Sequence, residues 1–264
     1  MPSRRVELEA LRRRIDAFED ALAERCAERV EPTAFGTAYL DPAFPQRYSS
    51  NFIRIRRTLD GVDADAIAAD ADRVLGEHDL THRQLDVHDD GNGARLSAGF
   101  RELGWSVETL IHMAQTHDPE PRPAADVADV DFATARPLIE ENLRGQPYGD
   151  SESVIRQLRD FRGVLEREAG ARFFVGRVDG RAASVCEAYV LGDVGQVEDV
   201  NTLEAFRGRG LASGTVLAAS VWARANGADV VFLVADEDDW PKALYARLGF
   251  EQVGRFWSFT RTPS

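Results

Sequence analysis

A glycine-rich, basic turn is the segment of this chain whose residue types and spacing could do chemistry. Glycine allows a backbone to approach an anion, and the first N–H groups of a helix lack partners within that helix. The positive end of the helix dipole and two arginines would add attraction for phosphate. The turn therefore predicts a phosphate site, and the alternative is an ordinary strand-to-helix turn with surface arginines. It reads Arg207-Gly208-Arg209-Gly210-Leu211-Ala212.

The neighbouring residues place this turn between a strand and a helix. Residues 197–202 are apolar and acidic and predict a strand, and residues 213–225 predict an amphipathic helix. That helix would carry Leu217, Val221 and Trp222 on one side. No Gly-Lys-Ser/Thr follows the glycines and they lack the Gly-x-Gly-x-x-Gly spacing, so neither of those nucleotide-binding loops is present.

The chain after the turn predicts a strand, a short helix and two further strands. Residues 230–234 form a continuous apolar, β-branched run that is typical of a buried strand. Pro241 suits the first turn of a helix that follows an aspartate cap. This helix would run to Leu248 and end at Gly249. The last two strands are expected at residues 250–253 and 255–261.

Two short motifs in this region together resemble the GNAT superfamily of N-acetyltransferases. The first matches the family's pyrophosphate signature, and the second matches its helix-to-strand signature. One helix and one strand separate them, as in that family, and the resemblance covers about residues 126–264. The motifs are Arg207-x-x-Gly210-x-Ala212 and Leu244-Tyr245-x-x-x-Gly249-Phe250.

The resemblance implies that acetyl-CoA is the cosubstrate. In the family, the strand before the turn pairs by its backbone with the pantetheine arm, and the turn N–H groups hold the pyrophosphate. An asparagine often precedes the tyrosine helix, where this chain has Asp238 and Asp239, and an ionised aspartate accepts a hydrogen bond but cannot donate one. The cofactor-binding residues implied are Val200, Asn201, Thr202, Arg207, Gly208, Arg209, Gly210, Leu211, Ala212, Ser213 and Asp238.

The resemblance also implies catalytic roles for Tyr245 and Glu198. Tyr245 matches the family's usual general acid, which protonates the departing thiolate, and the alternative is a core tyrosine that only packs. Side chains alternate along a strand, so alternate residues from Gln196 to Thr202, including Glu198, are expected on one face. Some relatives have their glutamate at the position of Gln196, which cannot act as a base, so Glu198 is the candidate base. The alternative is a carboxylate that binds a cationic substrate or is only solvated.

We expect an α/β (α+β) fold of two acetyltransferase-like domains after a long N-terminal helix. Each domain would be a mixed, mostly antiparallel central sheet flanked by helices. Residues 1–117 would form a degenerate acetyltransferase-like domain that includes the N-terminal helix. Residues 118–125, which contain three prolines, would be a linker, and residues 126–264 would be the catalytic GNAT domain.

The degenerate copy is inferred from a repeated helix ending. In the first half, Phe100 stands where the second half has Tyr245. Residues 56–63 also lack a turn of glycines and arginines. Two unrelated α/β pieces that share a Leu-Gly-aromatic ending are the alternative. The two endings are Phe100-x-x-Leu103-Gly104-Trp105 and Tyr245-x-x-Leu248-Gly249-Phe250.

The N-terminal helix is expected over residues 4–29, because apolar residues from Leu8 to Leu22 follow 3-4 spacing. An intramolecular cover helix is favoured over a coiled coil. In the acceptor region, Tyr148 and Trp240 are candidate walls of a pocket. Further strands are expected at residues 35–40, 51–55, 82–87, 106–113 and 127–130, helices at 64–75, 93–103, 132–143 and 151–168, and a hairpin about Asp179-Gly180.

Composition narrows the class of protein. The formal net charge of −13 argues against a nucleic-acid partner and is compatible with a cationic amine, although an acid-rich surface alone would also explain it. No apolar run approaches the ~20 residues of a membrane span, and an apolar signal core is missing, so a cytoplasmic location is expected. Two cysteines make no disulfide framework, and five histidines show no zinc pattern, so no metal is expected and surface or capping roles are favoured for the histidines.

The sequence therefore predicts an N-acetyltransferase that transfers acetyl from acetyl-CoA to a primary amine of a small molecule or peptide by direct attack. The alternative is a non-catalytic acyl-CoA-binding sensor or interaction protein. A monomer is favoured over a homodimer, because two fused copies could mimic a dimer. The identity of the acceptor is left open.

Overall fold

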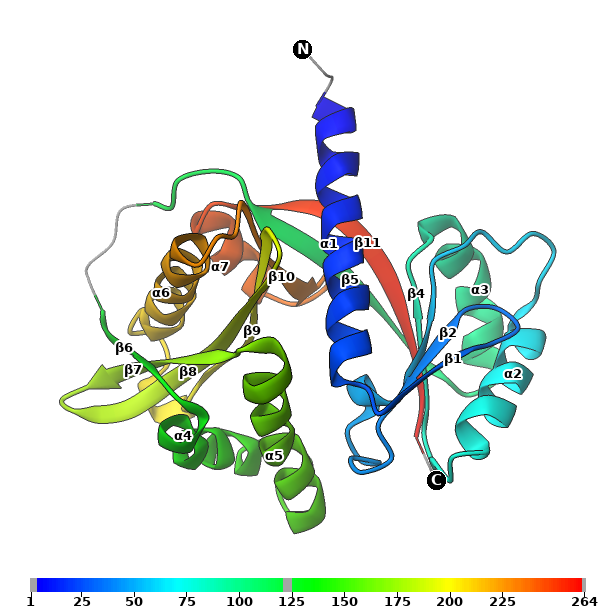
Figure 1. The fold of residues 1–264 in the computed structure, drawn as a ribbon, viewed down its shortest axis with the longest axis horizontal. Helices are drawn as coiled ribbons and strands as arrows, with labels where there is room; N and C mark the ends of the chain where they lie inside the picture. Colours follow the sequence, from blue (N-terminus) through cyan, green and yellow to red (C-terminus); the bar gives the residue numbers. More distant parts are fainter. Residues whose placement is uncertain (1–3, 121–124, 263–264) are drawn as a thin grey trace. The chain divides into compact units, whose positions relative to one another are not determined.

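The structure, a computed structural model, describes residues 4–120 and 125–262 of the chain (Figure 1). Its residues form two compact units, named here the first and the second unit. Each unit takes segments from both halves of the sequence. The first unit comprises Met1–Leu22, His112–Ala235 and Asp239–Val253, and the second comprises Ala23–Ile111, Asp236–Asp238 and Gly254–Ser264.

The predicted domains and the observed units divide the chain differently. The prediction places residues 1–117 and 126–264 in consecutive domains, whereas the units are interleaved along the sequence. A unit is defined by contacts and a predicted domain by the order of motifs, so the predicted domains stay a prediction. Residues 121–124 of the predicted linker lie outside the described residues.

The first unit is built on a mixed, mostly antiparallel sheet, as expected. Its strands lie in the order β6–β7–β8–β9–β10, and neighbours are antiparallel except β9 and β10, which run parallel. The predicted hairpin about Asp179-Gly180 joins β7 to β8, and both turn residues have positive φ. After β10 comes β5, whose residues His112–Gln115 belong to this unit. The bounds are Ser106–Gln115 for β5, Asp126–Val130 for β6, Arg172–Val178 for β7, Arg181–Leu191 for β8, Val194–Thr202 for β9 and Val230–Asp236 for β10.

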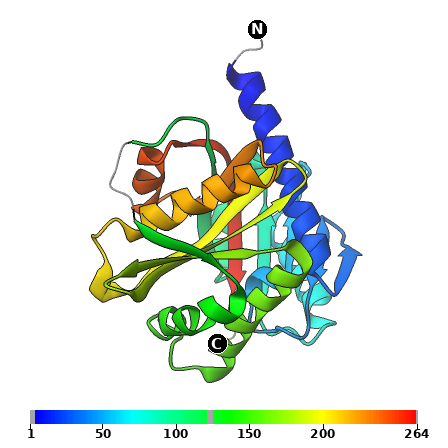
Figure 2. The same cartoon turned by 60° about the vertical axis from the view of Figure 1, so that its left-hand side comes forward.

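Helices cover both faces of this sheet (Figure 2). α6 packs against β7, β8 and β9 on one face, and α4 and α5 contact β8 on the other. α7 follows β10 and precedes β11. The helix bounds are Arg4–Cys26 for α1, Phe132–Arg144 for α4, Glu152–Ala169 for α5, Leu211–Ala225 for α6 and Pro241–Arg247 for α7, and β11 is Phe250–Arg261.

The buried face of α6 differs from the predicted one. Val221, which was expected on the apolar side, is 68% exposed. The buried residues are mostly small, and a Cβ added at Gly195 of β9 would lie 2.9 Å from the Cβ of Ala223. The helix therefore lies too close to the sheet for large side chains at its centre, and the sequence pattern of large apolar residues was misleading. The buried residues are Leu211, Ser213, Thr215, Val216, Ala219, Ser220 and Ala223.

α1 covers the other face of the first unit, which confirms an intramolecular role for its apolar stripe. Ile15 is fully buried, and the ring of Phe18 stacks on Tyr189 of β8 and meets Phe232 of β10 edge-on. The helix ends at Cys26 rather than at residue 29. The chain from Arg29 to Pro32 instead pairs with β2 as strand β1.

The second unit has its own mixed sheet. β1, β2 and β3 are antiparallel neighbours, β3 and β4 run parallel, and β4 pairs antiparallel with the part of β11 in this unit. Two helices, α2 and α3, pack together and contact β4. A core of Ile67, Leu75, Leu85, Phe100 and Phe259 joins helices and strands. The remaining bounds are Arg29–Pro32 for β1, Thr37–Leu40 for β2, Phe52–Ile55 for β3, Ala64–Gly76 for α2, Arg83–Val87 for β4 and Asp90–Glu102 for α3.

Three further predictions were wrong in detail. Residues 250–261 form one continuous strand rather than two, because Gly254 does not interrupt β11. The N-cap of α7 is Trp240, which makes no side-chain cap, and the predicted aspartate cap is absent from this described helix end. Surface or capping roles were expected for the histidines, but His82, His88 and His112 are buried, so the surface role is wrong for these three. The Nε2 atom of His112 lies 2.8 Å from a carboxylate oxygen of Glu19 on α1.

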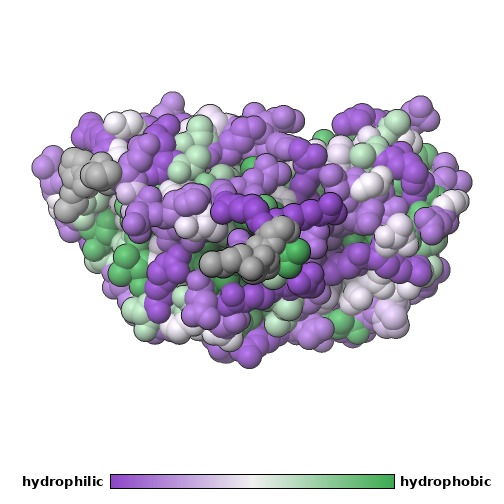
Figure 3. Space-filling model, turned by 90° about the horizontal axis from the view of Figure 1, so that it is seen from above, coloured by the Kyte–Doolittle hydropathy of each residue, from purple (hydrophilic) through white to green (hydrophobic). Residues whose placement is uncertain are grey.

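The surface of the molecule is largely hydrophilic. On the face shown in Figure 3, hydrophobic residues occur singly or in small groups among hydrophilic ones. Among the described residues, every helix is too short or too polar to cross a membrane. These observations agree with the composition of the chain, in which 29% of residues are charged.

We expect Phe18→Ala to lower the free energy of unfolding by about 3 kcal/mol, because the ring is buried against two other aromatic rings. Val6→Ala, on the same helix but at a side chain that is 49% exposed, should change it by less than about 0.5 kcal/mol. Urea unfolding at two protein concentrations measures both values. Equal effects of the two substitutions, or a midpoint that rises with concentration, would show that α1 is held by another chain.

Candidate active site

The predicted phosphate-binding turn has the conformation that its glycines allow. It follows a short 3-10 helix, Glu204–Phe206, and leads directly into α6. Gly208 and Gly210 have φ values of 76° and 77°, in the left-handed region that other residues rarely adopt. Gly210 is the N-cap of α6, and no side chain caps this helix. The first amides of α6 are thus left to an external acceptor.

The starts of α4 and α5, two other helices of the first unit, differ from the start of α6 because each has a side-chain cap. The side chain of Asp131 accepts a hydrogen bond from an N–H of the first turn of α4. The side chain of Ser151 does the same for α5. A carboxylate at such a cap already supplies the negative charge that the helix end favours. The start of α6 therefore suits a bound anion better than the starts of α4 and α5, whose first amides already have a side-chain acceptor.

Arginines around the turn are held by local contacts. The Nε of Arg207 donates to the carbonyl of Thr202 at 3.3 Å. The guanidinium groups of Arg209 and Arg181 lie over the ring of Phe206, 5.4 and 5.0 Å from its centroid. Arg181 also forms an ion pair with Glu141 at 3.1 Å, whereas the cation–π contact of Arg209 restrains its guanidinium and leaves N–H groups that can bind an anion at the surface. The turn thus combines backbone donors with positive charge.

The strands before the turn separate next to it. In the described sheet, β9 pairs with β10 only from Val194 to Gln196, opposite Val230 to Phe232. Beyond Gln196, β9 continues to Thr202 along β8 alone. Its backbone edge on the β10 side is therefore available to pair with an extended ligand, which fits the predicted role of Val200, Asn201 and Thr202.

A bulge in β9 overturns the predicted alternation of its side chains. Glu198 pairs with Glu187 of β8, but Asn201 pairs with Val185, so β9 has one residue more than β8 between these pairs. Partners directly across a sheet share a face. Glu198 and Asn201 therefore lie on one face, and Thr202, next along the strand, lies on the opposite face. The prediction assumed an unbroken strand.

One face of the separated strands carries a buried polar cluster. Tyr189 donates its hydroxyl hydrogen to a carboxylate oxygen of Glu198, which is partly exposed. Glu187 is 2% exposed, and one of its oxygens lies 3.6 Å from the Nε of Arg162 on α5. Arg162 also forms an ion pair with Asp199. This is the face that α1, α4 and α5 cover.

The opposite face carries Tyr245. Its side chain is 8% exposed and its ring meets Phe250 edge-on, with the centroids 6.3 Å apart. Burial, together with smaller effects of the nearby Cys186 and Asp239, raises the pKa of Tyr245 to about 12. Cys186 is fully buried and bonds to Thr215 of α6, and its burial raises the thiol pKa. Tyr245 therefore stays protonated and able to donate near α6.

Gly249 explains why the tyrosine helix ends where it does. Its φ is 86°, and a Cβ there would lie 2.1 Å from the carbonyl oxygen of His117. The N–H groups of Thr116 and His117 both donate to the carbonyl of Gly249. No other residue fits this close approach, so the Gly-Phe motif has a structural cause. Gly104, the matching glycine of the second unit, has φ 79°.

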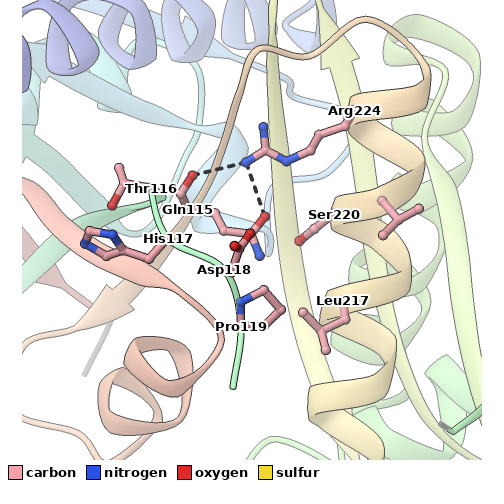
Figure 4. A pocket seen from close by; sticks show the side chains of 9 residues that line it. Gln115, Thr116, His117, Asp118, Pro119, Leu217, Ser220 and Arg224 are labelled. Atoms are coloured by element: carbon pink, nitrogen blue, oxygen red, sulfur yellow. Dashed lines mark hydrogen bonds between the residues drawn. The ribbon is translucent and has the colours of Figure 1, made fainter. Parts of the chain in front are cut away.

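A cavity of about 640 Å³ lies beside the outer face of α6 (Figure 4). Arg224 crosses it and donates to the backbone oxygen of Gln115 at 3.1 Å and to its side-chain oxygen at 3.3 Å. This arginine ties α6 to the end of β5. The other lining residues are Thr116, His117, Asp118, Pro119, Leu217, Ser220 and Val221.

The remaining predicted site residues lie at the surface. Trp240 is 68% exposed and Tyr148 is 41% exposed. Burial raises the pKa of the Tyr148 hydroxyl, and the positive charge of the nearby Arg162 partly offsets this rise. Asp238 is exposed, and its N–H donates to the carboxylate of Asp236. Its role as a cofactor contact stays a prediction.

Sequence reasoning missed three residues of the polar cluster. Glu187 and Tyr189 lie in a strand that otherwise reads as buried, and Arg162 lies among the apolar residues of α5. A charged side chain within an apolar run is the signal that could have identified Glu187 and Arg162. Phe161 and Leu165, apolar residues of the same helix as Arg162, are also buried.

Comparison with known proteins adds to this geometry. The sequence model of a family described as acetyltransferase (GNAT) matches residues 136–250. Among curated proteins, no significant match is found. Solved structures resemble the chain at less than 25% identity, so this likeness concerns the fold alone.

Three of these structures cover most of the chain. A conserved protein of unknown function from Staphylococcus epidermidis has a TM-score of 0.71 and 16% identity, over 90% of this chain and 95% of that one. A GCN5-related N-acetyltransferase from Kribbella flavida has a TM-score of 0.64 and 16% identity, over 96% and 95%. A tandem GNAT protein from the clavulanic acid biosynthesis pathway has a TM-score of 0.53 and 19% identity, over 87% and 80%.

The raised pKa of Tyr245 predicts a pH dependence of stability. Because the pKa is about 12 in the folded chain and ~10 when unfolded, the contribution is complete below pH ~10 and is lost as the pH rises to ~12. Wild type should lose about 2–3 kcal/mol more of its unfolding free energy over this interval than Tyr245→Phe does. Urea unfolding of both proteins across the interval measures the difference. Parallel losses would contradict the burial of this hydroxyl.

Proposed function

We propose that this chain transfers acetyl from acetyl-CoA to a primary amine by direct attack, since the sequence model of the acetyltransferase (GNAT) family matches residues 136–250. The observation that carries the proposal is that β9 separates from β10 at a point where a different polar group lies on each face of the strands. Glu198 lies on one face of the separated strands and Tyr245 on the other. An amine and a thioester that met in this opening would each find a proton-transfer group.

The residues at the turn fit the pyrophosphate of acetyl-CoA. Glycines with positive φ, an α6 terminus without a side-chain cap, and Arg207 and Arg209 would hold it through residues 207–213. Residues 200–202 of β9 would pair with the pantetheine arm. When bound, acetyl-CoA supplies an activated acyl group whose sulfur can leave.

Glu198 is proposed as the base and Tyr245 as the acid. The carboxylate of Glu198 would accept a proton from the attacking nitrogen, while the hydrogen bond from Tyr189 fixes its orientation. A carbon–nitrogen bond forms and the carbon–sulfur bond breaks. Tyr245, protonated because burial raises its pKa, would donate its proton toward the departing sulfur.

The second unit is proposed not to bind a second acetyl-CoA. Its helix α2 begins at Asp63, whose carboxylate accepts the N–H of Ala66 at 2.9 Å. This negative cap takes the position that an anion would need. Phe100 also replaces the tyrosine. The fold likeness to a tandem GNAT protein supports a degenerate copy, and the proposal includes a cytoplasmic monomer without a nucleic-acid or metal partner.

A non-catalytic acyl-CoA sensor is the second candidate. The exposed Asp238 and Asp239, which stand where the family often has asparagine, favour it. Release of free thiol from acetyl-CoA with a panel of primary amines separates the two. Tight binding without release by any amine, in a folded sample, would favour the sensor.

Substitution at the turn tests cofactor binding. Gly210→Ala puts a side chain at φ 77°, which costs about 1–2 kcal/mol and displaces the first amides of α6. We expect acetyl-CoA to bind about 5–10-fold more weakly, as measured by isothermal titration. The control is Gly180→Ala, in the β7–β8 hairpin, where φ is 78° and the space is equally open. Equal affinities for the two variants would exclude the turn as the binding site.

Substitution of the two catalytic candidates tests the chemistry. We expect Glu198→Gln and Tyr245→Phe each to lower kcat by about 100-fold while leaving acetyl-CoA affinity within about threefold of wild type. Tyr48→Phe, in the second unit, is the control and should keep wild-type turnover. Steady-state thiol release measures all three. Unchanged kcat in either variant, with chemistry rate-limiting, would remove that residue from the mechanism.

A further inference from the structure

The bulge in β9 depends on an aspartate in a strained conformation. Two residues, Asp199 and Val200, lie opposite the single Cys186 of β8. Asp199 has φ 52°, one of three described non-glycine residues with positive φ. In bulges of this kind the left-handed position is usually glycine, because a Cβ is disfavoured there. Aspartate adopts this conformation less readily than glycine does, so a contact that holds Asp199 would stabilise the bulge.

Arg162 of α5 supplies that contact. The side chain of Arg162 is 10% exposed, and its Nη2 donates to a carboxylate oxygen of Asp199. Its Nη1 donates to the carbonyl of Leu158, one turn earlier in α5, and its Nε lies 3.6 Å from Glu187 on β8. A single guanidinium thus links α5 to both strands at the bulge.

The bulge lies between the two functional parts of β9. Glu198, the candidate base, precedes Asp199, and the backbone proposed to pair with pantetheine begins at Val200. After the bulge, the side-chain amide of Asn201 donates to the carbonyl of Asp199 at 3.1 Å. The bulge therefore sets the direction of the backbone at Asn201 and Thr202 relative to Glu198.

We propose that Arg162 is a positioning residue that holds Asp199 in its left-handed conformation, and so aligns the β9 backbone for acetyl-CoA. This inference rests on the proposed function. Arg162 itself touches neither reactant in the proposal. The carboxylate of Asp199 serves only to bind the guanidinium of Arg162. Acetyl-CoA binding therefore depends on the conformation of residue 199 and not on its charge.

Two substitutions of Asp199 separate conformation from charge. Asp199→Gly loses the ion pair but adopts φ 52° without steric cost. Asp199→Ala loses the ion pair and disfavours that conformation. We expect acetyl-CoA to bind Asp199→Gly within about threefold of wild type and Asp199→Ala about tenfold more weakly, by isothermal titration without an acceptor. Equal weakening in both variants would overturn the proposal, as would wild-type affinity of Asp199→Ala.

Rescue tests the role of Arg162 directly. Arg162→Gln should bind acetyl-CoA about tenfold more weakly, and adding Asp199→Gly should restore most of that loss, because glycine no longer needs the grip. A merely structural loss of α5 packing would not be rescued at residue 199. A double variant as weak as Arg162→Gln would overturn the proposal. If Arg162→Gln does not fold, the two Asp199 variants decide the question.

Hydrogen exchange keeps this test separate from the proposed function. Without any ligand, the amide of Asn201 should exchange at least about tenfold faster in Asp199→Ala than in Asp199→Gly, since the bulge is lost only in the former. Should wild type fail to bind acetyl-CoA, the proposed function falls, while this comparison still decides the role of Arg162. Equal exchange in the two variants would overturn it.

Discussion

The end of the pairing between β9 and β10 is the constraint on which the proposed site depends. Parallel strands that stop exchanging hydrogen bonds after three residue pairs leave backbone groups that must find other partners. The chain places this opening where β9 leads into the glycine turn and α6. Backbone pairing with an extended acyl-CoA would satisfy the freed edge. The same gap would let groups on opposite faces of the sheet reach one reacting centre.

The two faces of the sheet at this opening carry different groups. On one face, α6 packs closely through small residues, which brings its open N-terminus next to the sheet and the buried Thr215 next to Cys186 of β8. On the other face, α1 and α5 cover the strands, and Arg162 and Tyr189 hold Asp199 and Glu198. Burial therefore keeps Tyr245 protonated on the first face, while hydrogen bonding fixes the carboxylate on the second.

Much of the fold could be predicted because local patterns and packing agree. The turn glycines, the Leu-Gly-aromatic helix endings and the strand-to-helix order all reflect positive φ or close approach, which only certain residues allow. The face of α6 could not be predicted, because close packing against Gly195 depends on a distant strand. The bulge at Asp199 was equally hidden, since aspartate is not the residue that marks such a position. The contact of Arg162 with Asp199, which is remote from it in sequence, follows from tertiary structure alone.

The most direct test of the account is a map of amide chemical shifts as the labelled protein is titrated with acetyl-CoA. The account predicts that the largest changes fall at residues 208–213 and 200–202, with none at residues 56–63 of the second unit. Changes centred on residues 56–63, or on the cavity beside Gln115 and Arg224, with the turn unaffected, would contradict it.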